Sequence, residues 1–395
     1  MRYCILLSII INIFYQFEIT NAFISKILEL RKNHQLHNNN RNIKMCIDTG
    51  PAGIDNTFAN LKTSPGRNDD SWRTPITSIL PINKEKISIR PELITFDAFG
   101  TLITPSQSIG RWYREALNLQ TDMQIRLPRP ALFTASFNIV LTEMNKKYPC
   151  FGALNSMDER DWWYQVVDQT YRSTTGLTNT IDSNELSLLI PKAFDFLYDD
   201  IFSTNQGWLI KDDTIYVLQK LIEWRDQGNG PQIGIISNFD SRLNNIINEL
   251  GLDKYIKNDL LLNSYDCQSE KPSTGMFEIA MKNAGVTDSS KCFHIGDNIN
   301  SDIVGAINAG WGAMRYNEWF DEDFPDWDSF DTEEQAEEGA ESRSVLMQWG
   351  RKDSDSGLEW YELWGLDDVL TLFGFPEDDN KPIKTTYIRN YRDDY

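Results

Sequence analysis

Five polar residues in the middle of the chain have types and positions that suit covalent catalysis at a single site. They lie at the ends of short apolar runs or just before a helical pattern, and they are Asp97, Ser237, Asn238, Lys271 and Asp297. A carboxylate beside an ammonium and a hydroxyl can act as a nucleophile, and water can then hydrolyse the ester or acyl phosphate that forms. One aspartate at a strand end is more often a helix cap or turn residue, but the five together in this order indicate an active site.

The apolar runs predict the sheet that would bring these residues together. Short β-rich segments occur at 93–96, 232–236, 260–262, 292–295 and 313–316, and helical patterns separate the later ones. Strands spaced by helix-length segments indicate a parallel sheet with helices on both faces. Ligands bind beyond the carboxyl ends of the strands in such sheets, which is where the polar residues are expected.

A long segment separates the first run from the second. Asp97 and Ser237 are 140 positions apart (237 − 97), which is too many for one crossover connection. Residues 106–205 have helical patterns and few strand-like runs, and Arg111 lies in the first of these helices. The sequence therefore predicts an inserted helical lid that closes over the site, excludes water and selects the substrate.

The motifs around the polar residues resemble those of the haloacid dehalogenase superfamily. The segment FDAFGTL is similar to its first motif, with Asp97 as the nucleophile. IISNFD is similar to the second motif, with Ser237 and Asn238, and Lys271 followed by a proline is similar to the third. The resemblance implies an α/β fold in which a Rossmann-like parallel sheet forms the core and carries an inserted all-helical cap domain.

The segment HIGDNINSD is similar to the fourth motif of the superfamily, with Asp297 and Asp302 as its acids. In the Mg²⁺-dependent members these acids accompany a metal, so the resemblance implies Mg²⁺ as the cofactor. The implied ligand set is Asp97, the backbone carbonyl of Phe99, Asp297 and Asp302. These are oxygen ligands, which a hard cation such as Mg²⁺ prefers.

The resemblance covers residues 90–317, and two stretches of the sequence indicate a particular group within the superfamily. Residues 150–167 and 237–252 are similar to the group of haloacid dehalogenase-like hydrolase domain-containing protein 3. We expect a hydrolase acting on a small phosphorylated or otherwise activated metabolite. No residue of the predicted lid matches a motif that would name the substrate.

Phe99 departs from the pattern of the superfamily's phosphatases, which carry a second Asp two residues after the nucleophile to protonate the leaving oxygen. A phenyl ring cannot transfer that proton, and acid–base catalysis contributes about 10² to 10⁴ in rate. Three interpretations stay open. The enzyme could act on a substrate with a good leaving group, or it could be a 2-haloacid dehalogenase-like enzyme, since those enzymes carry Tyr at this position. The third interpretation is a non-catalytic binding protein. Phe99, Thr101 and Arg111 are candidates to face the substrate or the cap, and Asp240 is an alternative proton donor.

Composition excludes several classes of function. A formal charge of −20 and a pI near 4.6 oppose binding to nucleic acid. The five cysteines are far apart and form no CxxC pair, so neither a disulfide framework nor a zinc knuckle is indicated. Two of the three histidines lie near the amino terminus, and His294 lies inside a predicted strand, where a packed residue is expected instead of a member of a catalytic triad.

The amino-terminal segment has the features of a targeting leader. An apolar run at 3–14 is followed by small residues at 20–22, as in a signal peptide, and is too short to span a bilayer. The basic stretch 23–45 begins with Phe, and the whole resembles the two-part leader of proteins sent to complex algal plastids. Plastid localisation is the expectation, with the secretory pathway or the cytoplasm as alternatives, and we expect no stable membrane insertion of the mature protein.

Residues 318–341 contain twelve acidic residues and no Lys or Arg, interleaved with aromatic residues. They predict either an exposed solubilising insertion or a docking segment for a basic protein partner.

The predicted domains are a signal-like segment at 1–22, a transit-like segment at 23–45, a linker at 46–88, the core at 89–105 and 206–375 with an acidic insertion at 318–356, the helical cap at 106–205, and a polar tail at 376–395.

Overall fold

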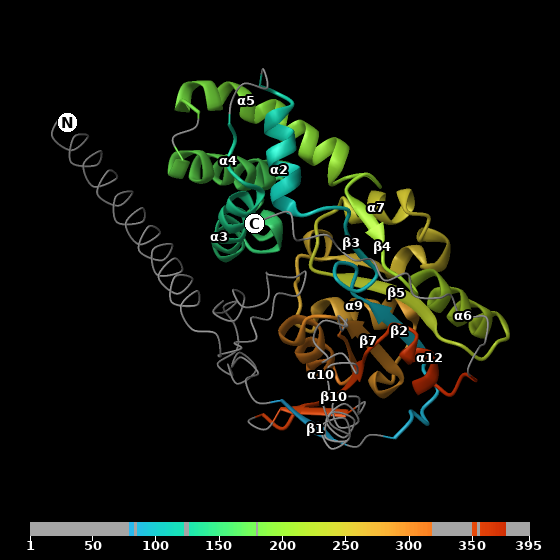
Figure 1. The fold of residues 1–395 in the computed structure, drawn as a ribbon. Coiled ribbons are helices and arrows are strands. Elements are labelled where there is room, and N and C mark those ends of the chain that lie inside the picture. Colours follow the sequence, from blue (N-terminus) through green and yellow to red (C-terminus); the bar gives the residue numbers. More distant parts are fainter. Residues whose placement is uncertain are drawn as a thin grey trace, which may run out of the picture. The chain divides into compact units, whose positions relative to one another are not determined.

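The computed structural model describes residues 79–82, 85–121, 126–178, 181–317, 350–353 and 356–376 (Figure 1). The predicted signal-like and transit-like segments, the acidic stretch 318–341 and residues 377–395 of the predicted tail lie outside the described residues. Among the described residues, no helix is long and apolar enough to cross a membrane.

The centre of the fold is a parallel sheet, as the apolar runs predicted. Its parallel strands are β2 (Leu93–Phe96), β5 (Gln232–Ser237), β6 (Leu261–Asn263), β7 (Cys292–Gly296) and β8 (Gly312–Tyr316). Strand β2 lies between β5 and β7, with Phe96 opposite Ile235 on one side and Ile295 on the other. The carboxyl ends of these three strands therefore lie level at one edge of the sheet, and the predicted α/β class is confirmed.

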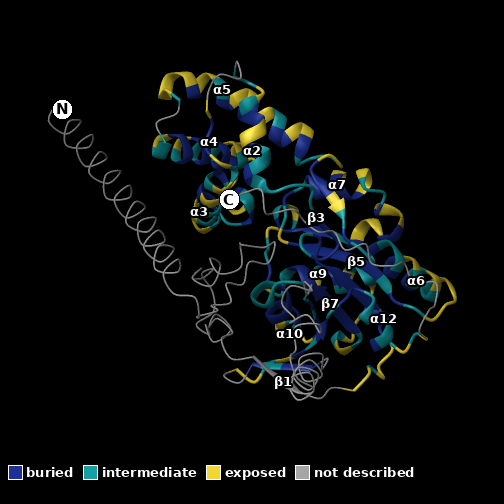
Figure 2. Cartoon of the chain, in the orientation of Figure 1, coloured by how far each residue is buried: buried dark blue, intermediate teal, exposed yellow. Residues whose placement is uncertain are grey.

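Helices cover both faces of this sheet, which is why every residue of β2 is buried (Figure 2). On one face, α6 (Thr214–Asp226), α7 (Leu243–Glu249) and α12 (Asp368–Leu372) contribute to the apolar cluster that contains Ile94. Helices α9 (Gly275–Ala284) and α10 (Val304–Asn308) belong to a second cluster, which contains Leu93. Adjacent residues of a strand point to opposite faces, so each helical layer takes alternate side chains of the same strand.

Three further strands extend the sheet beyond β8. Strand β10 (Glu359–Leu363) pairs parallel with β8, β9 (Gly350–Asp353) pairs antiparallel with β10, and β1 (Ile79–Ile82) pairs antiparallel with β9. These strands correct two predicted boundaries, because β1 lies in the segment interpreted as a linker and β9 in the segment interpreted as the acidic insertion. The sequence GRKD of β9 has no apolar alternation, so its own residues do not predict a strand, and it forms by pairing with the nearby β10 and with the distant β1.

The long segment between the first and second motifs is helical. Its elements are α2 (Ile109–Asn118), α3 (Pro130–Lys147), α4 (Glu159–Thr178), α5 (Ser183–Asp195), the 3₁₀ segment η3 (Cys150–Asn155) and the π-helical segment η4 (Phe196–Ile201). They pack around an apolar cluster of their own, in which Tyr113, Phe133, Trp162 and Tyr171 are almost fully buried. We call this segment the helical insertion.

Short elements complete the described part of the chain. The antiparallel strands β3 (Ile103–Pro105) and β4 (Trp208–Ile210) pair where the chain enters and leaves the helical insertion. The remaining short helical elements are α8 (Ser264–Cys267), η5 (Asp253–Tyr255), η6 (Asn258–Leu260), η7 (Ser289–Lys291) and the π-helical η8 (Ile299–Ile303).

Candidate active site

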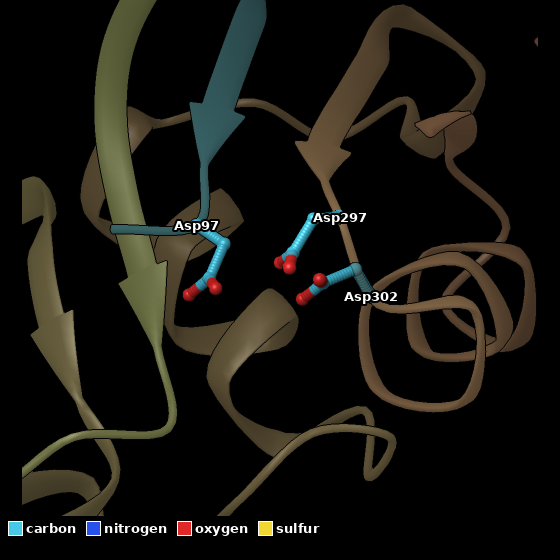
Figure 3. Close-up of side chains that lie close together, drawn as sticks. All are labelled: Asp97, Asp297 and Asp302. Carbon is cyan, nitrogen blue, oxygen red and sulfur yellow. The ribbon is translucent and has the colours of Figure 1, made fainter. Parts of the chain in front are cut away.

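Three aspartates meet at the carboxyl edge of the sheet. Asp97 directly follows β2, Asp297 directly follows β7, and Asp302 lies in the π-helical turn η8. Figure 3 shows their carboxylates pointing toward a common space, and at least one oxygen of each lies within 4.8 Å of the others. The backbone N–H of Asp97 donates to the carbonyl of Ile295 at 2.8 Å, which extends the β2–β7 pairing to the aspartate itself.

Lys271 places its ammonium between two of these carboxylates. Its Nζ lies 2.9 Å from Oδ1 of Asp97 and 2.5 Å from Oδ1 of Asp302, and it donates to the carbonyl of Ile236 at 2.6 Å. The lysine side chain is almost fully buried. A buried ammonium is costly unless it is paired, so the two carboxylates and the cation stabilise each other in the folded protein.

Asn238 holds the backbone of Lys271 in place. The N–H of Lys271 donates to Oδ1 of Asn238 at 2.7 Å, and Nδ2 of Asn238 donates to the carbonyl of Lys271 at 2.9 Å. The predicted catalytic residue Asn238 is therefore a positioning residue in this structure.

Ser237 is buried at the end of β5. The hydrogen bond of its hydroxyl to Asp97 favours the ionised form of that carboxyl and so acts to lower the pKa of Asp97.

Burial and the charge of Lys271 have opposing effects on the pKa of Asp97. Burial raises the pKa of Asp97, the ammonium of Lys271 acts against this rise, and the Asp302 carboxylate adds to it. Burial would lower the pKa of Lys271, but Asp302 and Asp97 raise it above its usual value. The lysine thus stays charged at neutral pH, but it only partly offsets the effect of burial, so the pKa of Asp97 lies above its usual value.

His294 belongs to the support of this site and not to a catalytic triad. It is fully buried in β7, where burial lowers its pKa and keeps the ring neutral. Its Nε2 lies 3.3 Å from Oδ1 of Asp302 and its Nδ1 lies 2.9 Å from Oγ1 of Thr95. Because a carboxylate can only accept, Nε2 carries the proton and Nδ1 accepts from the threonine hydroxyl. The expectation of a packed strand residue is confirmed.

The three aspartates fit the implied Mg²⁺ by chemistry and by space. Their carboxylate oxygens are the hard donors that Mg²⁺ prefers. The carboxylate of Asp297 lies in the space beside Gly100, where φ is +83°. A Cβ on residue 100 would lie 2.4 Å from Oδ2 of Asp297, so a larger residue would collide with the carboxylate. Asp302 has partners on both oxygens, because its Oδ2 also accepts from the N–H of Asn298 at 3.0 Å. Asp97 is also paired, through Lys271, so all three aspartates stay in the implied ligand set.

Phe99 places no acid near Asp97. Its ring packs edge-on against Trp208, with 6.0 Å between the ring centroids, and joins the apolar cluster on that face of the sheet. Asp240 does not replace the missing acid, because it is fully buried and accepts two hydrogen bonds from the guanidinium of Arg242. A third donor, Nε1 of Trp163 in α4, binds the same carboxylate at 2.7 Å.

The two remaining predicted substrate-facing residues lie in different settings. Thr101 is fully buried and its hydroxyl has no hydrogen-bond partner in the structure, which corrects the expectation of a substrate contact. Arg111 lies half-buried in the first turn of α2, on the helical insertion, where its N–H donates to Oγ of Ser108. Neither residue belongs to the group of aspartates around Lys271.

The family model of the haloacid dehalogenase-like hydrolases matches residues 91–310, more than half of the chain. The chain belongs to this family. This hydrolase is 28% identical over 234 residues to the Rhythmically expressed gene 2 protein of Drosophila melanogaster, an alignment that covers 58% of this chain and 84% of the relative. It is 27% identical over 219 residues to haloacid dehalogenase-like hydrolase domain-containing protein 3 of Xenopus laevis, covering 55% and 81%.

Solved structures resemble the hydrolase as well. One is the putative HAD-hydrolase YfnB from Bacillus subtilis, in an orthorhombic crystal form bound to magnesium. It is 17% identical with a TM-score of 0.43, over 72% of this chain and all of that chain. The resemblance that the four motifs predicted is confirmed at the level of the family.

Proposed function

We propose that this hydrolase cleaves a small phosphorylated or otherwise activated metabolite through a covalent intermediate on Asp97, with Mg²⁺ as cofactor. The observation that carries the proposal is the ammonium of Lys271, 2.9 Å from Asp97 and buried among carboxylates at the edge of the sheet. A paired cation of this kind favours the ionised form of the nucleophile and opposes the rise in pKa that burial causes. Asp97, Asp297 and Asp302 would hold the metal, which supplies charge neutralisation on the phosphoryl oxygens when bound.

In the first step a carboxylate oxygen of Asp97 forms a bond to phosphorus while the bond to the leaving oxygen breaks with its electron pair. In the second step water attacks the phosphorus of the aspartyl phosphate, which restores the carboxylate and releases inorganic phosphate. Lys271 offsets the negative charge throughout. Because Phe99 cannot protonate the leaving oxygen, the substrates that suit the site have leaving groups that are stable as anions, such as the carboxylate of an acyl phosphate.

Phe99 also favours a second candidate, a 2-haloacid dehalogenase-like activity. Asp97 would then attack the carbon that bears the halogen, the carbon–halogen bond would break with its electrons on the halide, and water would hydrolyse the resulting ester. A halide needs no proton to leave. A non-catalytic binding role is the third alternative, and it is less consistent with a lysine buried against the nucleophile at this cost in desolvation.

The test is hydrolysis by the full chain, because β1 at residues 79–82 belongs to the sheet and a shorter protein would lack it. The substrates are acetyl phosphate, an aryl phosphate, sugar phosphates, nucleotides and 2-chloropropionate, each with and without Mg²⁺, beside Asp97→Asn. We expect Mg²⁺-dependent cleavage of acetyl phosphate and the aryl phosphate, lower rates on sugar phosphates, and a loss of at least about 10³-fold in the variant.

The other outcomes separate the candidates. Metal-independent release of chloride that Asp97→Asn abolishes would assign the dehalogenase-like activity. Equal background rates from both proteins on the whole panel would contradict both catalytic proposals and favour a binding role. Binding of a phosphate-mimicking metal fluoride, measured as a rise in Tm, would then show whether the pocket around Asp97 is assembled.

A further inference from the structure

Arg315 connects the loop of Asp297 to the carboxyl-terminal strands of the sheet. Strand β8 lies between β7 and β10, and Arg315 is opposite Gly296 on one side and Glu362 on the other. Residues at paired positions of neighbouring strands point to the same face of a sheet. The arginine can therefore reach across both neighbours at the height where β7 ends and the Asp297 loop begins.

The guanidinium makes a contact in each direction. Its Nε donates to the backbone carbonyl of Asp297 at 3.3 Å, and its Nη1 donates to Oε1 of Glu362 at 3.3 Å. Asp297 is one of the acids of the implied metal site, and its carboxylate lies with those of Asp97 and Asp302 within 4.8 Å of one another. The hydrogen bond to the Asp297 carbonyl fixes the peptide from which that carboxylate projects.

Glu362 is itself held by the sheet. Its side chain is almost fully buried, and its second oxygen accepts from Nε1 of Trp360 at 2.9 Å, an indole that is fully buried in β10. A buried carboxylate with a charged donor on one oxygen and an indole donor on the other has little freedom to move. Glu362 therefore gives Arg315 a fixed partner on β10, on the side of β8 away from the Asp297 loop.

We propose that Arg315 is a positioning residue for the metal-binding acid Asp297, and that Glu362 on β10 holds Arg315 in its working position. The inference rests on the proposed function, since it takes Asp297 as a Mg²⁺ ligand. Partners of this kind orient the ligands of a metal, and their replacement typically weakens metal binding by about 10- to 100-fold. The strands beyond β8 then have a role in the active site as well as in the sheet.

The test measures Mg²⁺ affinity of the full chain by isothermal titration, and the Tm of each metal-free variant. Arg315→Lys keeps the charge but loses the fixed Nε and Nη1 donors, so we expect the Kd for Mg²⁺ to rise about tenfold. Glu362→Gln should raise it less, about threefold, because an amide holds the guanidinium less firmly than a carboxylate. In the double variant we expect the loss of Arg315→Lys alone, since Glu362 acts through Arg315.

Lys352→Gln is the matched control. It removes an exposed ion pair that joins Lys352 of β9 to Glu359 of β10, the strand that also carries Glu362, without touching Arg315, and it should leave the Kd unchanged. An unchanged Kd in Arg315→Lys, or an equal loss in Lys352→Gln, would overturn the inference. If Arg315→Lys does not fold, a wild-type Kd in Glu362→Gln would overturn it instead. Wild-type protein that binds Mg²⁺ no better than Asp297→Asn would overturn the proposed metal site first, and the inference with it.

Discussion

At the scale of single residues, the site depends on how closely three carboxylates can approach one another. Lys271 lies between Asp97 and Asp302 and offsets part of their charge, whereas the Asp297 carboxylate has space because residue 100 has no side chain. Glycine at this position is required twice, once for the left-handed φ of +83° and once for the space that the Asp297 carboxylate occupies. The two requirements can be separated by experiment, because other glycines of the chain have a left-handed φ but no neighbouring atom that an added Cβ would meet.

Gly100→Ala should impair the metal site. The new Cβ would lie 2.4 Å from Oδ2 of Asp297, so the carboxylate must move, and we expect the Kd for Mg²⁺ to rise at least about tenfold and hydrolysis to fall with it. Gly285→Ala is the control, because Gly285 has a φ of +69° with no atom near the added Cβ. It should cost about 1 to 2 kcal/mol of stability and leave Mg²⁺ binding intact. Equal Mg²⁺ affinity in both variants would contradict the role given to Gly100.

At the scale of elements, α4 of the helical insertion is joined to the loop that follows β5. Trp163 donates to Asp240, and the guanidinium of Arg242 lies between the Trp163 and Tyr198 rings, 4.9 and 4.2 Å from their centroids. Glu159 accepts hydrogen bonds from both the N–H and the hydroxyl of Ser241. The loop that begins with Ser237 and Asn238 is thus fixed by the insertion as well as by the sheet.

Asp240→Ala should destabilise the fold strongly. It would leave Arg242, which is about 9% exposed, without its carboxylate, and an unpaired buried charge typically costs about 3 to 5 kcal/mol of unfolding free energy. Asp226→Ala breaks the exposed pair with Arg225 and should cost less than about 1 kcal/mol. Urea unfolding followed by tryptophan fluorescence measures both. If Asp240→Ala does not express, Trp163→Phe removes one donor to the same carboxylate and should still cost about 1.5 to 3 kcal/mol.

The part of this architecture that local sequence patterns can predict is the part built from apolar runs. Strands β2, β5, β6, β7 and β8 are mainly apolar segments, and the residues that follow them reach the same edge because parallel strands end there. Strand β9 has a polar sequence and forms only through its partners. Trp163 contacts the side chain of Asp240, and Arg315 contacts the backbone carbonyl of Asp297. Each pair joins residues apart in the chain, and nothing in the residues near either partner indicates the other.

At the scale of the whole molecule, the net charge affects the binding of both Mg²⁺ and the anionic substrate of the proposed reaction. The chain carries a formal charge of −20, of which the three aspartates and one lysine of the site account for a formal −2 (1 − 3). A negative field of this kind attracts Mg²⁺ and repels an anionic phosphate. Dissolved salt screens both effects, since the Debye length falls to about 10 Å at 0.1 M ionic strength.

Raising KCl from 20 to 200 mM should therefore lower the affinity for Mg²⁺ and raise kcat/KM for an anionic substrate. The Kd for Mg²⁺ should rise about threefold, because screening weakens the attraction of the cation to the carboxylates. At saturating Mg²⁺, kcat/KM for an anionic substrate such as acetyl phosphate should rise by a similar factor, because screening also weakens the repulsion of the substrate. The value of kcat at saturating substrate is the internal control and should stay constant, since the bound complex no longer depends on long-range encounter. A shift of Mg²⁺ affinity and kcat/KM in the same direction would contradict this account, because it would mean that direct ion binding, and not the field of the chain, controls access to the site.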